Sequence, residues 1–132
     1  LRATASFGEV PEQYRTALVS RGILRGFALG DAPLVRHSVA GSLEYRFRID
    51  TPPWFDELGL QDWWGAVFVD AGVGANSYEG LLRSSIYADV GVTGRARVKY
   101  LGIPIYVWGS VAWPVSGRSG SPRVTLGLDW AF

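Results

Sequence analysis

The chain has 132 residues, and its 13 Lys and Arg against 12 Asp and Glu leave a formal net charge of +1. This balance excludes a strongly basic nucleic-acid-binding protein and an acidic tail protein. Hydrophobic residues make up 48% of the chain, too many for a disordered protein, yet no apolar run approaches the roughly 18 residues of a membrane-spanning helix.

Alternation of apolar and polar residues, the period of a β-strand with two unlike faces, runs through most of the chain. Leu43 and Tyr45 share one face of the first long run, whereas Glu44 and Arg46 share the other. The sequence predicts one all-β domain over residues 1–132, with a short candidate strand at 2–7, a long loop at about 9–38, and strands at 39–49, 63–73, 85–100, 103–115 and 123–132.

Residues typical of turns separate these runs, so we expect consecutive strands to pair as antiparallel hairpins. The separators rich in Gly, Pro, Ser and Asn fall at 50–53, 74–77, 101–102 and 116–122. Helix signals are weak throughout. The expected architecture is therefore an antiparallel up-and-down sheet.

The charged face of these strands favours a transmembrane β-barrel. Apolar residues facing lipid and polar residues facing the lumen, over about 9 to 11 residues a strand, are typical of such barrels. Aromatic residues lie near several ends of the runs, for example Trp63, Tyr100 and Trp113. The alternative is a soluble β-sandwich or a small soluble barrel that binds an apolar ligand.

The last residues strengthen the membrane interpretation. Apolar side chains alternate back from a terminal aromatic residue through Phe132, Trp130 and Leu128, and Gly127 precedes them. This ending resembles the C-terminal insertion signal of bacterial outer-membrane barrels. Leu126 departs from that signal, which usually has a polar residue before the glycine.

Three motifs occur in a fixed order along the chain. They are Leu-Arg-Gly-Phe at 24–27, a Glu at position 44 in the strand that follows, and Phe-x-Asp-x-Gly at 68–72 in the next strand. The ordered set resembles the C-terminal part of the bacterial surface-antigen (BamA/TamA) superfamily of outer-membrane insertases and translocases. The resemblance covers essentially the whole chain and implies the last six strands of a sixteen-stranded barrel.

The resemblance also implies that one long extracellular loop folds inward, into the barrel lumen. Arg25 offers a planar fork of donors suited to carboxylates, and the polar parity of Glu44 and Asp70 places both on the lumen side. We therefore expect Arg25, beside Gly26 and Phe27, to bridge Glu44 and Asp70. We call this arrangement the loop lock; the alternative is that Arg25 is a solvated loop cation.

A group of basic residues shares the polar face near the inner end of two strands: Arg46, Arg48, Arg95, Arg97 and Lys99. They could form a path for an anionic or unfolded client. A network with Asp and Glu side chains inside the lumen is the favoured interpretation.

Catalysis and cofactors are not expected. Cysteine is absent, which excludes disulfides, thiolate zinc sites and a cysteine nucleophile. His37 and Ser38 are adjacent, so they point to opposite sides of a strand, and no nucleophile elbow surrounds the serine. The loop carboxylates, including Asp31 and Asp62, lack the spacing of a calcium loop, and no phosphate-binding loop is present. We therefore predict no enzyme activity, no metal and no cofactor.

The sequence thus predicts an outer-membrane protein whose partners are the lipid bilayer and unfolded outer-membrane clients, with no nucleic acid. Six strands do not close a barrel of that family's size, so further strands and periplasmic domains are expected from the same or another chain. Residues 124–132 would form one side of a seam that opens laterally. An alternative is a barrel that anchors, or provides an exit pore for, a fused or associated enzyme or envelope complex.

Overall fold

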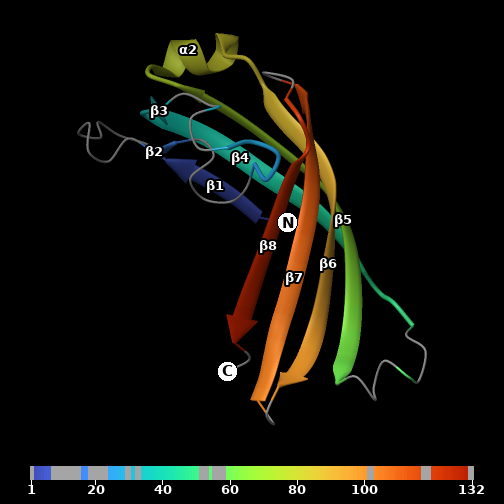
Figure 1. The fold of residues 1–132 in the computed structure, drawn as a ribbon. Helices are drawn as coiled ribbons and strands as arrows, with labels where there is room; N and C mark the ends of the chain where they lie inside the picture. The colour runs from blue at the N-terminus through green and yellow to red at the C-terminus, as the bar shows by residue number, and fades with distance from the viewer. Residues whose placement is uncertain are drawn as a thin grey trace.

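A computed structural model describes residues 2–6, 16–17, 24–28, 31, 34–50, 54, 59–100, 103–116 and 120–130 (Figure 1). Its elements in chain order are β1 (Arg2–Ser6), β2 (Thr16–Ala17), β3 (Leu34–Val35), β4 (His37–Arg48), β5 (Leu60–Ala75), α2 (Tyr78–Arg83), β6 (Tyr87–Tyr100), β7 (Ile103–Ser116) and β8 (Arg123–Trp130).

Six of the strands form one curved antiparallel sheet in the order β1-β4-β5-β6-β7-β8 (Figure 1). From β4 to β8 the spatial order follows the chain order, which is the up-and-down arrangement. The expected all-β antiparallel architecture is therefore confirmed. Within the described ranges the sheet is not closed, and β1 and β8 are its edge strands.

The predicted end of the long loop was two residues too late. His37 and Ser38, placed in the loop over 9–38, belong to β4, where Ser38 pairs with Ser6 of β1 and with Gly74 of β5. The loop also contains a small ribbon, because β2 pairs with β3. Strand β5 runs several residues beyond the predicted 63–73 at its N-terminal side.

A β-bulge explains that longer strand. The register of β5 against β6 shifts between Gln61 and Trp64, and Asp62 has a φ of 49°, a left-handed conformation that Asp tolerates better than most residues. Asp62, predicted to lie in a loop, is thereby placed on β5. Its carboxylate lies 3.5 Å from both Arg48 and Arg97.

Helix α2 was not expected from the sequence. Ser77 caps it by accepting a hydrogen bond from the Gly80 amide at 3.1 Å, and Glu79 lies in the first turn. Tyr78 stacks on His37 with ring centroids 4.3 Å apart, which fixes the helix at the sheet end opposite the end of β8 (Figure 1). The described part of the chain contains no helix long and apolar enough to cross a membrane.

The two faces of the sheet differ sharply. The face that carries the loop segment 24–28, which we call the inner face, contains Glu44, Asp70, Asp89 and most of the arginines of the strands. The opposite, outer face is apolar. One cross-strand row on it runs Tyr45, Val67, Val92, Val111 and Val124 through five neighbouring strands.

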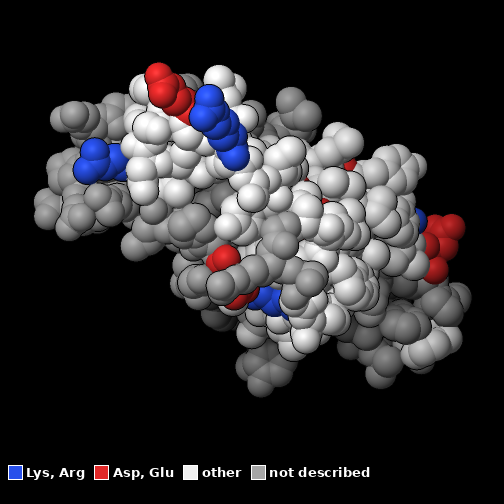
Figure 2. All heavy atoms as spheres, turned by 90° about the horizontal axis from the view of Figure 1, so that it is seen from above, with Lys and Arg blue, Asp and Glu red and all other residues white. Residues whose placement is uncertain are grey.

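The outer face remains exposed. Leu126 and Leu128 are 79% and 71% exposed, and Leu43 and Tyr45 are exposed by a similar fraction. Viewed from above, most of the described surface is uncharged, and its Lys, Arg, Asp and Glu side chains stand in small separate groups (Figure 2). The molecule thus presents an apolar surface outward and concentrates its charge inward.

Candidate functional site: the loop tip on the inner face

The loop segment Leu24–Ala28, the loop tip, is a compact turn. The Phe27 amide donates to the Leu24 carbonyl at 3.4 Å. Asp31 closes the other side, since its carboxylate accepts from the Ala28 amide at 2.6 Å and its own amide donates to the Ala28 carbonyl at 3.1 Å. These local bonds give the tip a defined shape.

Two apolar side chains anchor the tip. Leu24 and Phe27 are each only 1% exposed, and the Phe27 ring meets Tyr87 of β6 edge-on, with centroids 5.5 Å apart. Burying a side chain of this size contributes about 1.5–3 kcal/mol. The loop tip is therefore held by packing as well as by charge.

Arg25 brings together the residues that the sequence predicted for the lock. Its Nε and Nη2 donate to the two oxygens of Asp70 at 2.8 and 3.0 Å, and its Nη1 donates to Glu44 at 2.9 Å. Nη2 also reaches the Ser42 hydroxyl at 3.1 Å, and that hydroxyl donates to Asp70 at 2.5 Å. One guanidinium thus joins side chains from β4 and β5.

This ion pair is largely buried. The Asp70 side chain is fully buried and that of Arg25 is 21% exposed. The Arg25 guanidinium carbon lies 3.3 Å from the centroid of the Phe68 ring, in cation–π geometry. Burial lowers the pKa of Arg25, but hydrogen bonds to Asp70 and Glu44 outweigh it and raise that pKa above its ordinary value.

Gly26 passes close to a second buried carboxylate. A Cβ at Gly26 would lie 2.6 Å from the Cβ of Asp89, so only glycine permits this approach of loop to strand. Asp89 is fully buried and pairs in register with Asp70. Neither of its carboxylate oxygens has a hydrogen-bond partner of good geometry among the described residues.

Replacing Gly26 by Ala should therefore weaken loop docking by about 1–3 kcal/mol, as overpacking of a close contact usually does. Faster hydrogen exchange of a peptide containing residues 24–28 would measure the loss. The double variant G26A/D89G removes the colliding atom and should recover part of the protection. If residues 24–28 of G26A exchanged as slowly as those of the parent protein, the close approach of Gly26 to Asp89 would not contribute to loop docking.

The tip also reaches the far side of the sheet. Arg123, on the edge strand β8, donates a hydrogen bond from Nη1 to the carbonyl oxygen of Phe27. Arg25 and Phe27 are two residues apart but contact β4 and β5 on one side and β8 on the other. The loop tip consequently spans the inner face and ties its two sides together.

Four of the five basic residues predicted for the inner face lie near carboxylates. Arg46 lies 2.6 Å from Glu44, and Arg95 lies 3.8 Å from Asp129. The Asp62 carboxylate pairs with both Arg48 and Arg97. These pairs fit the charge-network interpretation of the basic residues.

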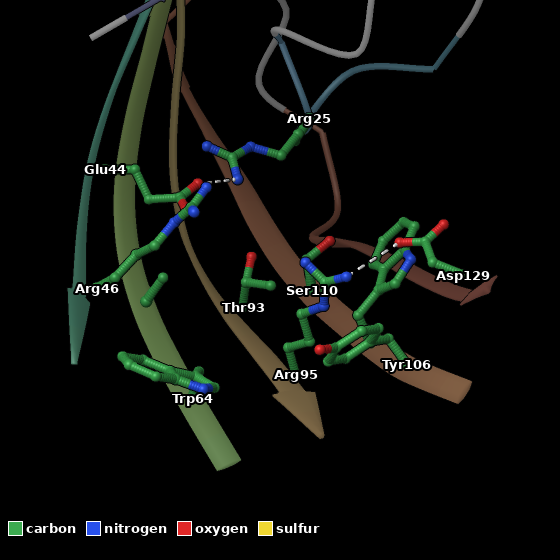
Figure 3. A pocket seen from close by; sticks show the side chains of 12 residues that line it. Arg25, Glu44, Arg46, Trp64, Thr93, Arg95, Tyr106, Ser110 and Asp129 are labelled. Atoms are coloured by element: carbon green, nitrogen blue, oxygen red, sulfur yellow. Dashed lines mark hydrogen bonds and ion pairs between the residues drawn. The ribbon is translucent and has the colours of Figure 1, made fainter. Parts of the chain in front are cut away.

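A cavity of about 760 Å³ lies on the inner face below Arg25 (Figure 3). Strands β4 to β8 all contribute to its lining, which includes three arginines, two carboxylates and three aromatic side chains: Arg25, Arg46, Arg95, Glu44, Asp129, Trp64, Tyr106 and Trp108. The volume falls in the range of small-molecule sites in proteins.

The residues expected to form a terminal signal lie on or beyond β8. Gly127 is covered by the Trp108 indole, which would collide with a Cβ placed at Gly127. Leu128 points to the exposed outer face. Trp130 ends β8, and Phe132 falls outside the described residues.

Sequence reasoning missed four residues at the loop tip: Ser42, Phe68, Asp89 and Arg123. A signal existed for three of them, since Phe68 begins the Phe-x-Asp-x-Gly motif and shares the parity of Asp70. Ser42 shares the parity of Glu44, and Asp89 shares the polar parity of the strand predicted over 85–100. Arg123 carried no signal, because only the curvature of the sheet brings β8 under the loop.

The described residues hold no group of three or more His, Asp or Glu side chains placed to bind a metal. His37 is buried against Tyr78. The geometry of the site serves to hold a loop and to present a charged, aromatic cavity. Scans against protein-family models, curated proteins and solved structures found no match to the chain.

Proposed function

We propose that the chain is part of an outer-membrane β-barrel of the surface-antigen type, which takes part in outer-membrane protein insertion or in protein translocation. The supporting observation is the inverted sheet: exposed apolar residues cover the outer face, while the charged inner face holds the loop tip. Lipid chains on the outside and an aqueous lumen on the inside match this polarity.

The energetics favour lipid as the cover of the outer face. Exposed apolar surface costs about 25 cal/mol per Å² relative to burial, and contiguous apolar patches of this kind are rare on soluble monomers. A soluble sandwich has the reverse polarity, with apolar side chains between its layers. Among the described residues, the loop tip lies on the charged face and the side chains of the apolar face are exposed.

The free edges of the sheet add a requirement. Unpaired backbone groups of an edge strand are costly in hydrocarbon. A barrel therefore needs partner strands along the free edges of β1 and β8. The proposal therefore includes further strands from the same or another chain as partners. Strand β8 would then form one side of a seam that can open toward the membrane.

A matched pair of substitutions on β8 tests the orientation of the sheet. Leu126→Arg places a charge on the outer face, where lipid would penalise it by about 2–4 kcal/mol near the bilayer centre. Thr125→Arg places the same charge on the inner face. We expect L126R to reduce the amount of folded protein in outer-membrane fractions severalfold, and T125R to leave it nearly unchanged.

Equal effects of the two variants would contradict the proposed orientation. A protein that fractionates without membranes would favour the soluble ligand-binding alternative. The activity itself is tested by reconstituting the complete polypeptide in liposomes and adding an unfolded outer-membrane protein. Faster folding of that client than in empty liposomes supports insertion. No acceleration, in a protein that does integrate, would favour an anchor or exit pore for an enzyme.

A further inference from the structure

The cavity on the inner face has a floor of small side chains. Cross-strand pairing aligns Arg46, Ala66, Thr93 and Ser110 in one row across β4 to β7. The two middle residues of that row are small, so the sheet is hollowed between Arg46 and Ser110. The loop tip bounds the hollow on one side through Arg25 (Figure 3).

Two guanidinium groups stand on opposite sides of this floor. Arg46 on β4 and Arg95 on β6 are separated by one strand, which corresponds to about 10 Å between their backbones. Figure 3 shows Arg46 beside Glu44 and Arg95 beside Asp129, at opposite sides of Thr93. Side chains of this length can converge on one group placed between them.

Both arginines can reach a ligand in the cavity. Arg46 bonds Glu44 through its Nε at 2.6 Å, and its side chain is 73% exposed. Arg95 meets Asp129 only at 3.8 Å, and both side chains are about half exposed, so this pair is weak. An anion between Arg46 and Arg95 would gain from both.

The floor offers a further polar group. The Thr93 hydroxyl is buried and has no hydrogen-bond partner within the described parts of the chain. Buried hydroxyls are normally paired, and a missing partner costs about 1–3 kcal/mol. Because the Thr93 oxygen is not exposed to the cavity in this structure, the hydroxyl must turn toward the cavity to donate to a carboxylate bound above Ala66.

Aromatic rings lie on both sides of Arg95, because Trp64 on β5 and Trp108 on β7 are its register partners. Trp64, Tyr106 and Trp108 line the cavity, and the guanidinium carbon of Arg95 lies 4.2 Å from the centroid of the Tyr106 ring. Such surfaces bind flat, apolar groups through stacking and burial. The cavity thus offers an anion site and a ring site side by side.

We propose that this cavity binds a carboxylate carried next to an aromatic ring, with Arg46, Arg95 and Thr93 holding the carboxylate and Tyr106 and Trp108 holding the ring. Glu44 and Asp129 oppose a multiply charged phosphate and can accept backbone amides. An acidic and aromatic segment of an extended polypeptide therefore fits, and so does a free aromatic acid. The site does not depend on the proposed membrane function.

Binding is tested on the purified complete protein with fluorescent probes and anisotropy. One probe is an end-blocked octapeptide with a central Glu-Phe, which carries the chemistry inside a peptide, and the other is labelled phenylalanine with a free carboxylate. Matched control peptides carry Gln-Phe and Glu-Ala. We expect saturable binding of at least one Glu-Phe or free-acid probe and at least fivefold weaker binding of both control peptides.

Variants assign the site. Arg95→Gln should raise Kd about tenfold or more, because a charge-assisted hydrogen bond is lost. Thr93→Val should raise Kd about threefold to tenfold. Arg83→Gln, on exposed helix α2 and away from the cavity, should leave Kd unchanged. Unsaturable binding, equal binding of the Gln-Phe peptide, or an equal loss in R83Q would overturn the proposal.

The two probes separate the sources of the ligand. Binding of the blocked peptide indicates a polypeptide segment, and binding of the free acid alone indicates a small molecule. Since no client insertion is measured, failure here overturns only the cavity proposal. Conversely, tight peptide binding by a protein that accelerates no insertion overturns only the proposed membrane activity.

Discussion

Replacing Arg25 by Ala should release the loop tip from the inner face. The substitution removes every hydrogen bond to the guanidinium and leaves the buried Asp70 carboxylate without its main partner. Breaking a buried ion pair by deleting one member typically costs about 3–5 kcal/mol. Part of the pair is exposed and water can enter, so we expect about 2–4 kcal/mol in loop docking.

Hydrogen exchange of a peptide that contains residues 24–28 measures this loss, because exchange of a docked segment reports its opening free energy. Peptides from the β6–β7 hairpin provide the internal reference and should keep their protection. Equal loss in both regions would mean that R25A unfolds the sheet, and no loss in either would reject the lock.

Arg25→Lys is the matched control. Lysine keeps the charge but has no planar fork, so it can bond Asp70 or Glu44 but cannot satisfy Asp70 through two parallel bonds. Its docking loss should fall between those of the parent and R25A. A lysine variant as protected as the parent would show that charge alone holds the loop.

The contacts of Arg25 could be predicted because two independent signals agreed. Period-two alternation put Glu44 and Asp70 on the charged face of adjacent strands, and the ordered motifs directed Arg25 to that face. Strand positions followed from the same alternation. Alternation is a local property of the chain. It predicts which face of the sheet a residue occupies, because the two faces of each strand have different surroundings.

The features that the sequence did not reveal depend on the curvature of the sheet, on strand register or on a local β-bulge. The bulge at Asp62 shifts register and moves a carboxylate from a predicted loop onto the inner face. Arg123 meets Phe27 only because the sheet curves. The pairing of Asp70 with Asp89 required the register between β5 and β6, which alternation leaves undetermined by multiples of two residues.

That register places two buried carboxylates side by side, and the same substitution at each should act in opposite directions. Asp70→Asn replaces one of the two carboxylate oxygens that bind Arg25 by an NH2 group. That group cannot accept a hydrogen bond from the guanidinium. Loss of a buried, hydrogen-bonded charge partner costs about 2–5 kcal/mol. Exchange of the segment 24–28 should accelerate accordingly.

Asp89→Asn should slow that exchange. No described bond joins Arg25 to Asp89, and among the described residues neither Asp89 oxygen has a hydrogen-bond partner of good geometry, so an ionised Asp89 opposes Asp70. The amide removes that repulsion and can donate to the Asp70 carboxylate, a gain of about 1 kcal/mol in loop docking. The shape of the side chain is retained beside Gly26.

The pair of variants excludes a general explanation. Damage to packing would accelerate exchange in both D70N and D89N, because the two residues are equally buried and adjacent. Opposite changes in the exchange rate require that Arg25 binds Asp70 and that Asp89 makes no favourable bond to this pair. If D89N accelerated exchange as much as D70N, Asp89 would be a supporting member of the lock, and the charge balance at the loop tip would have to be revised.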